Sequence, residues 1–525
     1  MRKNSVLPVK YEKDIKESSL SSFGGAPIFL EFIKSIGFDR MVSKRFQAKS
    51  DQGFHPFHNI LTLTLLNILG GESVSDVDSL ESDSGLKRIL KKCEKAFLGF
   101  AGRVFRKNRT GFFPSVTTLL TFLNSFKSDK EEEERESTPR GKSKILPTDE
   151  KFDNLVAINR DIILAAQTLN KQETATLDMD NNIIISNKRN AKVSYKKEKS
   201  YQPFNVYWAE QDLMVYSEFR DGNVPPGFEQ ERVLKESIKQ LPESVKTIQV
   251  RSDSAGYQHN FLEYMESGDS CHGKIEFTVS SDVSRSFRAA VLDTPEEEWA
   301  QVVYVDSAGY EITTNQEVAE ICFVPETKNK RKDAPVFRYL ATREATNIQM
   351  EFSQTGQLTF VTSDTVEKKL HLEVFKGVAY KVFGLVTNKT GSPLDVLLWH
   401  RKRCGKSEQE HSRLTKDMAG GRFPSGDFGP NAAWWQIAII SLNLLKIFQR
   451  QALPYKLKTS RIKTLNRHLF HIAIKVVKSS AGLVVRVNRE LPLFSIIQFA
   501  RRRILKIERA LEDTRIWREN EAVIR

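Results

Sequence analysis

The run TATLDMDNNIII at residues 174–185 constrains the fold of this chain more than any other segment. Its Thr, Leu and Ile residues predict a buried strand, yet Asp178 and Asp180 interrupt its middle. Side chains two residues apart lie on one face of a strand, so both carboxylates face the same way. An unpaired buried carboxylate is unfavourable, and a hard divalent cation with oxygen ligands is the simplest group that would neutralise two of them. The alternative is a pair of edge-strand or turn acids.

Strand-like and helix-like runs alternate around this segment, over residues 151–282. The strand-like runs are YQPFNVYWAE, LMVYSEFRDG, TIQVRSDSAG and KIEFTVSSD, and FEQERVLKESIKQL has apolar residues at helical spacing. This order predicts a mixed α/β sheet. Residues 283–390 contain many short strand-like runs and are interpreted as a β-rich insertion. The helical pattern resumes over residues 391–440, with Ser392 and Pro393 as the expected N-cap and first-turn residues.

The two ends of the chain differ in charge. Residues 1–127 predict an N-terminal helical domain, and residues 128–150, SDKEEEERESTPRGKSKILPTDE, predict an acidic, solvated linker. Residues 441–525 predict a helical region that carries 19 Lys and Arg against 6 Asp and Glu, a net charge of +13 out of +14 for the whole chain. Such a region is suited to a polyanion, most commonly nucleic acid. The alternative is a solvated surface of helices.

Several classes of protein are disfavoured. The four cysteines form no CxxC pair, which indicates neither a disulfide framework nor a zinc site and favours a reducing cytosol. No apolar segment follows the basic start MRKNSVLPVKYEKD, which argues against secretion. The run AAWWQIAIISLNLLKIF (432–448) is short for a membrane span and is interpreted as a buried core helix. Neither GxxxxGK[ST] nor HExxH occurs.

Two further acids are candidates for chemistry. Asp253, in QVRSDSAGY, follows a predicted strand, and ligands of α/β sheets bind at the carboxyl ends of strands. Spacing alone favours a helix N-cap or turn role for it. Glu408, or its neighbour Glu410, lies in the basic helix RKRCGKSEQEHSRLTKD. Either this helix is a solvated face with ion pairs, or one acid faces the sheet while the bases contact a DNA backbone.

Four segments together carry a family resemblance: LDMDNNIIISNKRNAKVSYKKEKSYQPFNVYWAE, EFRDGNVPPG, VRSDSAGYQHNFLEYMES and RCGKSEQEHSRLTKDMAGGRFPSGDFGPNAAWW. They resemble the DDE transposases of bacterial insertion sequences, in particular the thirteen-eighty family, over most of the chain. The resemblance implies an RNase H-like catalytic core in which Asp180, Asp253 and Glu408 are the catalytic, metal-binding acids. Asp180 is preferred to Asp178 because similar enzymes place small polar residues after the catalytic Asp. This chain departs from the family near Asn182, where the family often has a Thr.

The resemblance also implies a function. Two Mg²⁺ ions, with Mn²⁺ as a substitute, would support DNA cleavage at the element ends and strand transfer into target DNA. The expected partners are double-stranded element ends, bound by the helices of residues 20–127, target DNA, and further copies of the chain in a homodimer or larger assembly. No membrane is expected, and the expected location is cytoplasmic, at the nucleoid. A metal-dependent DNA nuclease without strand transfer and an inactive DNA-binding relic remain alternatives.

Contacts to the DNA backbone are expected from four bases of the helix that carries Glu408, namely Arg403, Lys406, Arg413 and Lys416. The family often has a phosphate-binding Lys seven residues after its catalytic Glu. This chain has Thr415 at that position and Lys416 directly after it.

Overall fold

The computed structural model describes residues 19–48, 52–107, 111–139, 142–305, 308–325, 335–345, 350–352, 358–360, 372–375, 378–480 and 482–512. The chain forms two compact units. Unit 1 is drawn from Met1–Ser125, Asp417–Ala419 and Ile440–Arg525, and unit 2 from Phe126–Lys416 and Gly420–Ile439. The two ends of the chain, which the sequence predicted as separate regions, therefore belong to one unit.

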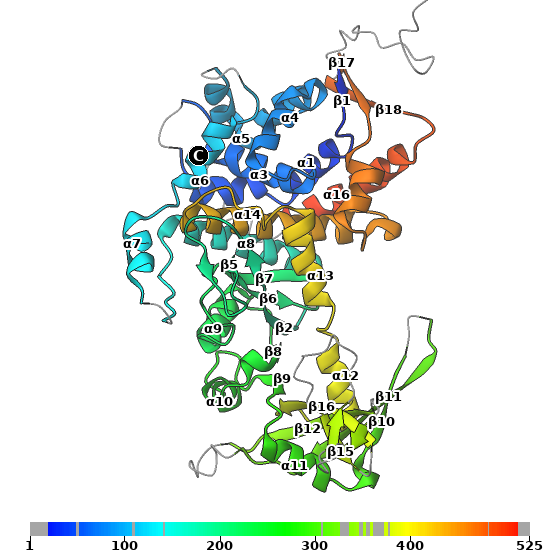
Figure 1. Ribbon diagram of the computed structural model, residues 1–525. Helices are drawn as coiled ribbons and strands as arrows, with labels where there is room; N and C mark the ends of the chain where they lie inside the picture. The colour runs from blue at the N-terminus through cyan, green and yellow to red at the C-terminus, as the bar shows by residue number, and fades with distance from the viewer. Residues whose placement is uncertain are drawn as a thin grey trace, which may run out of the picture. The chain divides into compact units, whose positions relative to one another are not determined.

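Unit 2 is built on a mixed sheet with the strand order β10-β11-β12-β16-β9-β8-β2-β6-β7, and β15 also pairs with β16 (Figure 1). The strands β2, β8 and β9 run parallel, whereas β6 is antiparallel to both β2 and β7. The predicted mixed α/β sheet is confirmed. The strands are β2 (Thr174–Asn181), β6 (Phe204–Trp208), β7 (Leu213–Glu218), β8 (Thr247–Ser252), β9 (Glu276–Ser281), β10 (Ala300–Val305), β11 (Glu311–Ile321), β12 (Arg338–Ala345), β15 (Leu372–Phe375) and β16 (Val378–Thr387).

The segment predicted as a β-rich insertion is continuous with this sheet. Strand β16 pairs antiparallel with β9, from Gly384 opposite Ser281 to Thr387 opposite Thr278. The inserted strands therefore extend the central sheet through backbone hydrogen bonds. Smaller strand pairings involve β3 (Ile184–Ile185), β4 (Lys192–Val193) and β5 (Lys199–Tyr201), and separately β13 (Met350–Phe352) with β14 (Leu358–Phe360).

Two helices of unit 2 lie where the sequence predicts helix, over Gln230–Gln240 and Pro393–Arg401. Helix α12 begins as expected, because Ser392 Oγ accepts a hydrogen bond from Asp395 N at 3.1 Å and Pro393 occupies the first turn. The helices are α7 (Asp129–Ser137), α8 (Glu150–Leu169), α9 (Gln230–Gln240), α10 (His259–Ser267), α11 (Arg285–Asp293), α12 (Pro393–Arg401), α13 (Lys406–Ser412) and α14 (Phe428–Ile447), which ends in unit 1.

The acidic segment 128–150 differs from the predicted solvated linker. It contains helix α7, and the Arg135 side chain on that helix is only 5% exposed. Its Nε donates to Asp221 Oδ2 at 2.9 Å, and its Nη1 donates to Glu132 Oε2 at 2.8 Å. The guanidinium also lies 4.0 Å from the centre of the Phe428 ring. The ion pair between Arg135 and Asp221, a residue far along the chain, therefore buries part of this charged segment.

Unit 1 combines helices from the N-terminal quarter of the chain with elements from its C-terminal end. Phe29 and Phe32 pack on Phe448, with ring centres 5.5 and 5.2 Å apart. The elements are β1 (Leu20–Ser21), α1 (Ala26–Ser35), α2 (Phe38–Arg45), α3 (Pro56–Ile68), α4 (Val77–Ser82), α5 (Ser84–Lys107), α6 (Val116–Asn124), α15 (Ile462–Leu465), β17 (Ile474–Ser479), β18 (Gly482–Val487) and α16 (Leu493–Glu512).

Two predictions about the C-terminal region have different outcomes. The run at 432–448 lies in helix α14 and in the turn that follows it, and its side chains are buried, so the predicted core helix is confirmed. The expectation that everything after residue 441 is helical is wrong, because β17 and β18 form a hairpin that also pairs with β1. Among the helices described, none combines the length and apolarity needed to cross a membrane.

Candidate active site

The two acids of strand β2, Asp178 and Asp180, have different surroundings. Asp178 is 1% exposed, and Arg251 on the neighbouring strand donates to both of its oxygens, from Nε at 2.5 Å and from Nη2 at 2.8 Å. Arg251 Nη1 also donates to the backbone oxygen of Trp399 at 2.9 Å. For Asp178 the hypothesis of a divalent cation is therefore wrong, because a guanidinium neutralises this carboxylate.

Asp180 and Asp253 lie at the same level of two neighbouring strands. The parallel register of β2 and β8 pairs Met179 with Ser252, so the next residue of each strand is one of the two predicted acids. Both acids stand at the carboxyl ends of their strands, the edge at which α/β sheets bind ligands. Asp253 also caps a short turn, because its Oδ1 accepts a hydrogen bond from Ala255 N at 3.1 Å.

Glu408 and Glu410 lie on the same short helix, α13, but differ in exposure. Glu408 is exposed in the first turn, whereas Glu410 is 2% exposed and lies 3.2 Å from Arg413 Nη1 through its Oε1. Glu410 thus has the surroundings of a structural ion pair. Glu408 is the acid of this helix that is accessible to a ligand.

The charges of the three predicted acids act on one another at Asp180. Burial raises the pKa of Asp180 to about 6, and the Arg403 guanidinium opposes this rise. The negative charges of Asp253 and Glu408 raise the pKa of Asp180 further. Asp180 is therefore the acid at which the charges of Asp253 and Glu408 both act.

The four bases predicted to contact a DNA backbone have different positions. Arg403 is 12% exposed, and its Nη2 lies 3.9 Å from Asp180 Oδ1, so it faces the acids. Lys406 Nζ lies 3.2 Å from Asp212 Oδ1, and Arg413 pairs with Glu410. Lys416 is exposed. Of the four side chains, Lys416 is thus the one most open to solvent, and Arg403 is turned inward by the carboxylate that it faces.

His411 is a neighbour of Asp180 that the sequence reasoning passed over. Its Nδ1 lies 3.9 Å from Asp180 Oδ2, and its Nε2 is 3.0 Å from Asn205 Nδ2. Burial, helped by the charge of Arg403, lowers the pKa of His411 to about 4. The sequence held a signal, because Asn205 and Ser217 are polar residues inside the strand-like runs FNVYW and LMVYSE.

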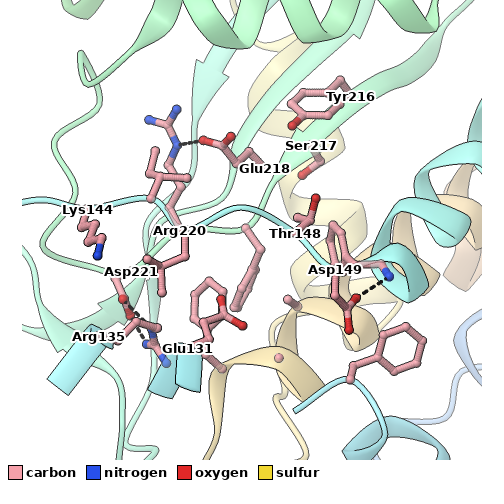
Figure 2. A pocket seen from close by; sticks show the side chains of 18 residues that line it. Glu131, Arg135, Lys144, Thr148, Asp149, Tyr216, Ser217, Glu218, Arg220 and Asp221 are labelled. Carbon is pink, nitrogen blue, oxygen red and sulfur yellow. Dashed lines mark hydrogen bonds and ion pairs between the residues drawn. The ribbon is translucent and has the colours of Figure 1, made fainter. Parts of the chain in front are cut away.

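A pocket of about 70 Å³ lies elsewhere in unit 2 (Figure 2). Its walls come from α7, the segment before α8, the end of β7 and the start of α14, and they include the Arg135–Asp221 ion pair. Burial raises the pKa of Glu131, on its wall, to about 7. None of Asp180, Asp253 and Glu408 lines this pocket, so it is separate from the three acids.

Whether the three acids suit a metal ion depends on their chemistry and their spacing. Carboxylate oxygens are the ligands that Mg²⁺ prefers, and a divalent cation would offset the repulsion that raises the pKa of Asp180. In the part of the chain that the structure describes, no three His, Cys, Asp or Glu side chains are grouped closely enough to hold a metal ion. The donor chemistry therefore fits a divalent cation, and the Arg403 guanidinium lies 3.9 Å from Asp180 Oδ1.

Comparisons with known proteins identify a family. A family model described as "Transposase DDE domain group 1" matches residues 8–509. Among solved structures, the piggyBac transposase in its synaptic complex with hairpin DNA, determined by cryo-EM, has a TM-score of 0.37 and 10% sequence identity. That alignment covers 96% of this chain and 84% of the piggyBac chain. No curated protein gives a significant match.

Proposed function

Because this chain belongs to the family of DDE transposase domains of group 1, we propose that it cleaves DNA at the ends of an insertion sequence and joins those ends to target DNA. DDE transposases generally use divalent metal ions. Within this family we place the chain with the thirteen-eighty insertion sequences. The cleaving unit in this proposal is unit 2, with Asp180, Asp253 and Glu408 as its catalytic acids.

One observation carries the proposal: the parallel register of β2 and β8 sets Asp180 and Asp253, 73 residues apart in sequence, side by side at the strand ends, where the charges of Asp253 and Glu408 both raise the pKa of Asp180. Two carboxylates at the carboxyl ends of parallel strands, together with Glu408 from helix α13, would form an oxygen-rich, anionic site. Bound there, two divalent ions, Mg²⁺ or Mn²⁺, would supply charge neutralisation at the phosphodiester and activation of the attacking oxygen. The side chains of Asp180, Asp253 and Glu408 would hold them.

We also propose that unit 2 has an RNase H-like core. The strand order β7-β6-β2-β8-β9, with β2, β8 and β9 parallel and β6 antiparallel, supports this layout. The same proposal assigns end recognition to the N-terminal helices and a homodimer or larger assembly to the DNA complex. A chain without residues 1–125 that still selects end DNA over random DNA would contradict the role of those helices.

The experiment uses the full chain and a duplex oligonucleotide with the terminal inverted repeats that flank its gene. With Mg²⁺ we expect nicked products and, when target DNA is added, joined products. Asp180→Ala, Asp253→Ala and Glu408→Ala should each abolish both, because each removes a carboxylate from the site. Gln409→Ala, an exposed neighbour on α13, is the matched control and should remain active.

The outcomes separate the candidate functions. Cleavage without joined products would identify a nuclease, and binding without cleavage would identify an inactive relic. Normal cleavage by any of the three Ala variants would remove that residue from the site.

A further inference from the structure

Four buried side chains form a row of polar contacts that leads to Asp180, namely Trp435, Ser217, Asn205 and His411. Trp435 Nε1 donates to Ser217 Oγ at 2.7 Å, and Ser217 Oγ donates to Asn205 Oδ1 at 2.6 Å. Asn205 Nδ2 is 3.0 Å from His411 Nε2, and His411 Nδ1 lies 3.9 Å from Asp180 Oδ2. The row runs from helix α14 across the sheet to helix α13 and back to β2.

The register of the sheet places the members of this row side by side. Asp180 on β2 is directly opposite Asn205 on β6, and Asn205 is directly opposite Ser217 on β7. Cross-strand partners have neighbouring side chains on one face of a sheet. Trp435, Ser217 and Asn205 are each at most 2% exposed, and His411 is 8% exposed. Water therefore has little access to these hydrogen bonds.

The indole end of the row sets the direction of every hydrogen bond in it. An indole N–H can only donate, so the Ser217 oxygen accepts from Trp435 and its single proton goes to Asn205 Oδ1. This orients the Asn205 amide with Nδ2, a donor, toward His411 Nε2. A ring nitrogen that accepts a hydrogen bond carries no proton. His411 is thereby held as the neutral tautomer with its proton on Nδ1, the nitrogen that faces Asp180.

From this row we infer that His411 is a positioning residue for Asp180, a role that rests on the proposed function of Asp180 as a catalytic acid. A neutral Nδ1–H donor orients the Oδ2 atom without cancelling the negative charge that a cation requires. Asp180 Oδ1 accepts from Asn181 N at 2.9 Å, so each oxygen faces its own donor. The 3.9 Å gap to His411 is about 1 Å longer than an N–H···O hydrogen bond, and such bonds commonly tighten when substrate binds.

The tautomer itself can be measured on the unmodified full chain. In long-range ¹H–¹⁵N spectra of protein labelled at histidine, His411 should show a protonated Nδ1 and an unprotonated Nε2; comparison with the spectrum of His411→Asn identifies its signals. Trp435→Phe removes the donor that orients the row and should introduce the other tautomer. A wild-type His411 that is protonated on Nε2 would overturn the inference. This measurement needs no DNA, so it stands apart from any failure of the proposed function.

Two substitutions of His411 separate positioning from packing. The amide nitrogen of Asn reaches about the position of Nδ1, whereas that of Gln reaches about the position of Nε2. We expect His411→Gln to lower both Mn²⁺ affinity and the single-turnover cleavage rate by about 10-fold to 100-fold, the usual effect of losing a group that orients a metal ligand. His411→Asn should restore most of both, with the KM for DNA unchanged in each variant. Equal losses of Mn²⁺ affinity in the two variants would show that His411 acts only through packing.

Discussion

Asp178 and Asp180 show how two acids on one face of a strand come to have different roles. Arg251 binds both oxygens of Asp178, whereas Asp180 has the longer 3.9 Å approach of Arg403. A carboxylate that is fully paired inside a protein has a structural role. Removing either partner of such a pair lowers the free energy of unfolding by about 3–5 kcal/mol. The partly satisfied carboxylate is the one with capacity for a ligand.

The raised pKa of Asp180 predicts a stability that depends on pH. The pKa is about 6 in the folded chain against an ordinary value of 3.8, so the protonated form is favoured by folding. The contribution of Asp180 to the stability of the folded chain is therefore complete below about pH 4 and is lost as the pH rises through 6. In EDTA at pH 8, Asp180→Asn should therefore raise the free energy of unfolding in urea by about 1–3 kcal/mol, and at pH 4 by almost nothing. A gain that is equal at both pH values would contradict this origin.

The two acids of helix α13 should differ in their effect on stability. Glu410 is buried against Arg413, so Glu410→Ala leaves a guanidinium without its carboxylate and should lower the free energy of unfolding by about 3 kcal/mol. Glu408 is exposed, and Glu408→Ala should change it by less than about 0.5 kcal/mol. Chemical denaturation of both variants checks this; equal losses would contradict a stabilising role of the buried Glu410–Arg413 ion pair.

The sequence indicated the site residues only in part. Asp180 and Asp253 could be predicted to lie near each other, because strand ends in α/β sheets meet at one edge. The pairing of Asp178 with Arg251 could not, because these residues are 73 positions apart and their contact depends on strand register. His411 lacked any metal-binding spacing. Its importance depends on its contact with Asn205, which the register of β2 and β6 sets opposite Asp180.

The sequence RFPSGDFGPNAAWW connects the acid-bearing helix to α14 by close packing. Asn431 is fully buried; it donates to the Ser425 backbone oxygen at 3.0 Å and accepts from Ser425 N at 3.0 Å. A Cβ on Gly429 would lie 2.1 Å from the backbone oxygen of Phe126. This motif is thus a structural connection, and its last Trp, Trp435, begins the polar row behind Asp180.

Gly429 should therefore tolerate no side chain. Gly429→Ala forces its helix away from Phe126 and should lower the free energy of unfolding by about 1–3 kcal/mol. Gly426→Ala is the matched control in the same motif, because a Cβ there would meet its nearest atom, Arg189 Cβ, at an ordinary 3.8 Å. Thermal or urea melts of the two variants compare them directly. If Gly426→Ala is the more damaging, the close approach to Phe126 is not what requires glycine.

A π-helical turn at Arg413–Asp417 follows α13 and bears on the family's phosphate-binding Lys. A π turn holds about one residue more than an α turn, so a residue eight positions after Glu408 returns to nearly the face that seven positions reach in an α-helix. Lys416 is that residue and is exposed, whereas Thr415 donates its hydroxyl to the His411 backbone oxygen at 2.7 Å. We therefore expect the backbone to compensate for the one-residue departure in the sequence, with Lys416 as the phosphate-binding residue.

Exchanging the two residues tests this compensation without changing composition. The double substitution Thr415→Lys with Lys416→Thr should weaken binding to nonspecific DNA and lower the slope of log affinity against log salt by about one, because one phosphate contact is lost. Lys416→Ala should lower the slope of log affinity against log salt by the same amount as the exchange does. Fluorescence anisotropy at several salt concentrations provides the measurement. A slope that the exchange leaves unchanged would place Lys416 outside the DNA contact.

Local sequence patterns predicted the elements of unit 2 better than those of unit 1. The alternation of apolar residues marked β2, β6, β7, β8 and β9 in the right order. Strands β17 and β18 were missed because the Lys and Arg residues of this region were interpreted only as net charge. Their hairpin also pairs with β1, a segment more than four hundred residues away. Helix α7 was missed for a similar reason, since its buried Arg135 depends on Asp221.

The composition of unit 1 from both ends of the chain predicts the effect of a deletion. Helix α1 packs against α16, and Phe29 and Phe32 pack on Phe448. Without residues 1–125, the amides of α16 and of residues 448–452 should lose protection in hydrogen exchange, because their apolar faces lose these partners. Amides of β2 and β8, in unit 2, should keep theirs. Full protection of α16 in the shortened chain would contradict this.

Unit 1 also sets an order of events during synthesis. The ribosome releases the helices before Ser125 long before Ile440 is made, an interval of roughly 15 to 60 s at ordinary elongation rates. During that time Phe29 and Phe32 have no Phe448 to pack on, while the whole of β2 and β8 has already emerged. Strands β2 and β8 are therefore complete before the partners of the N-terminal helices exist. A message cut short before codon 440 would encode both strands, together with N-terminal helices whose apolar partner Phe448 was never translated.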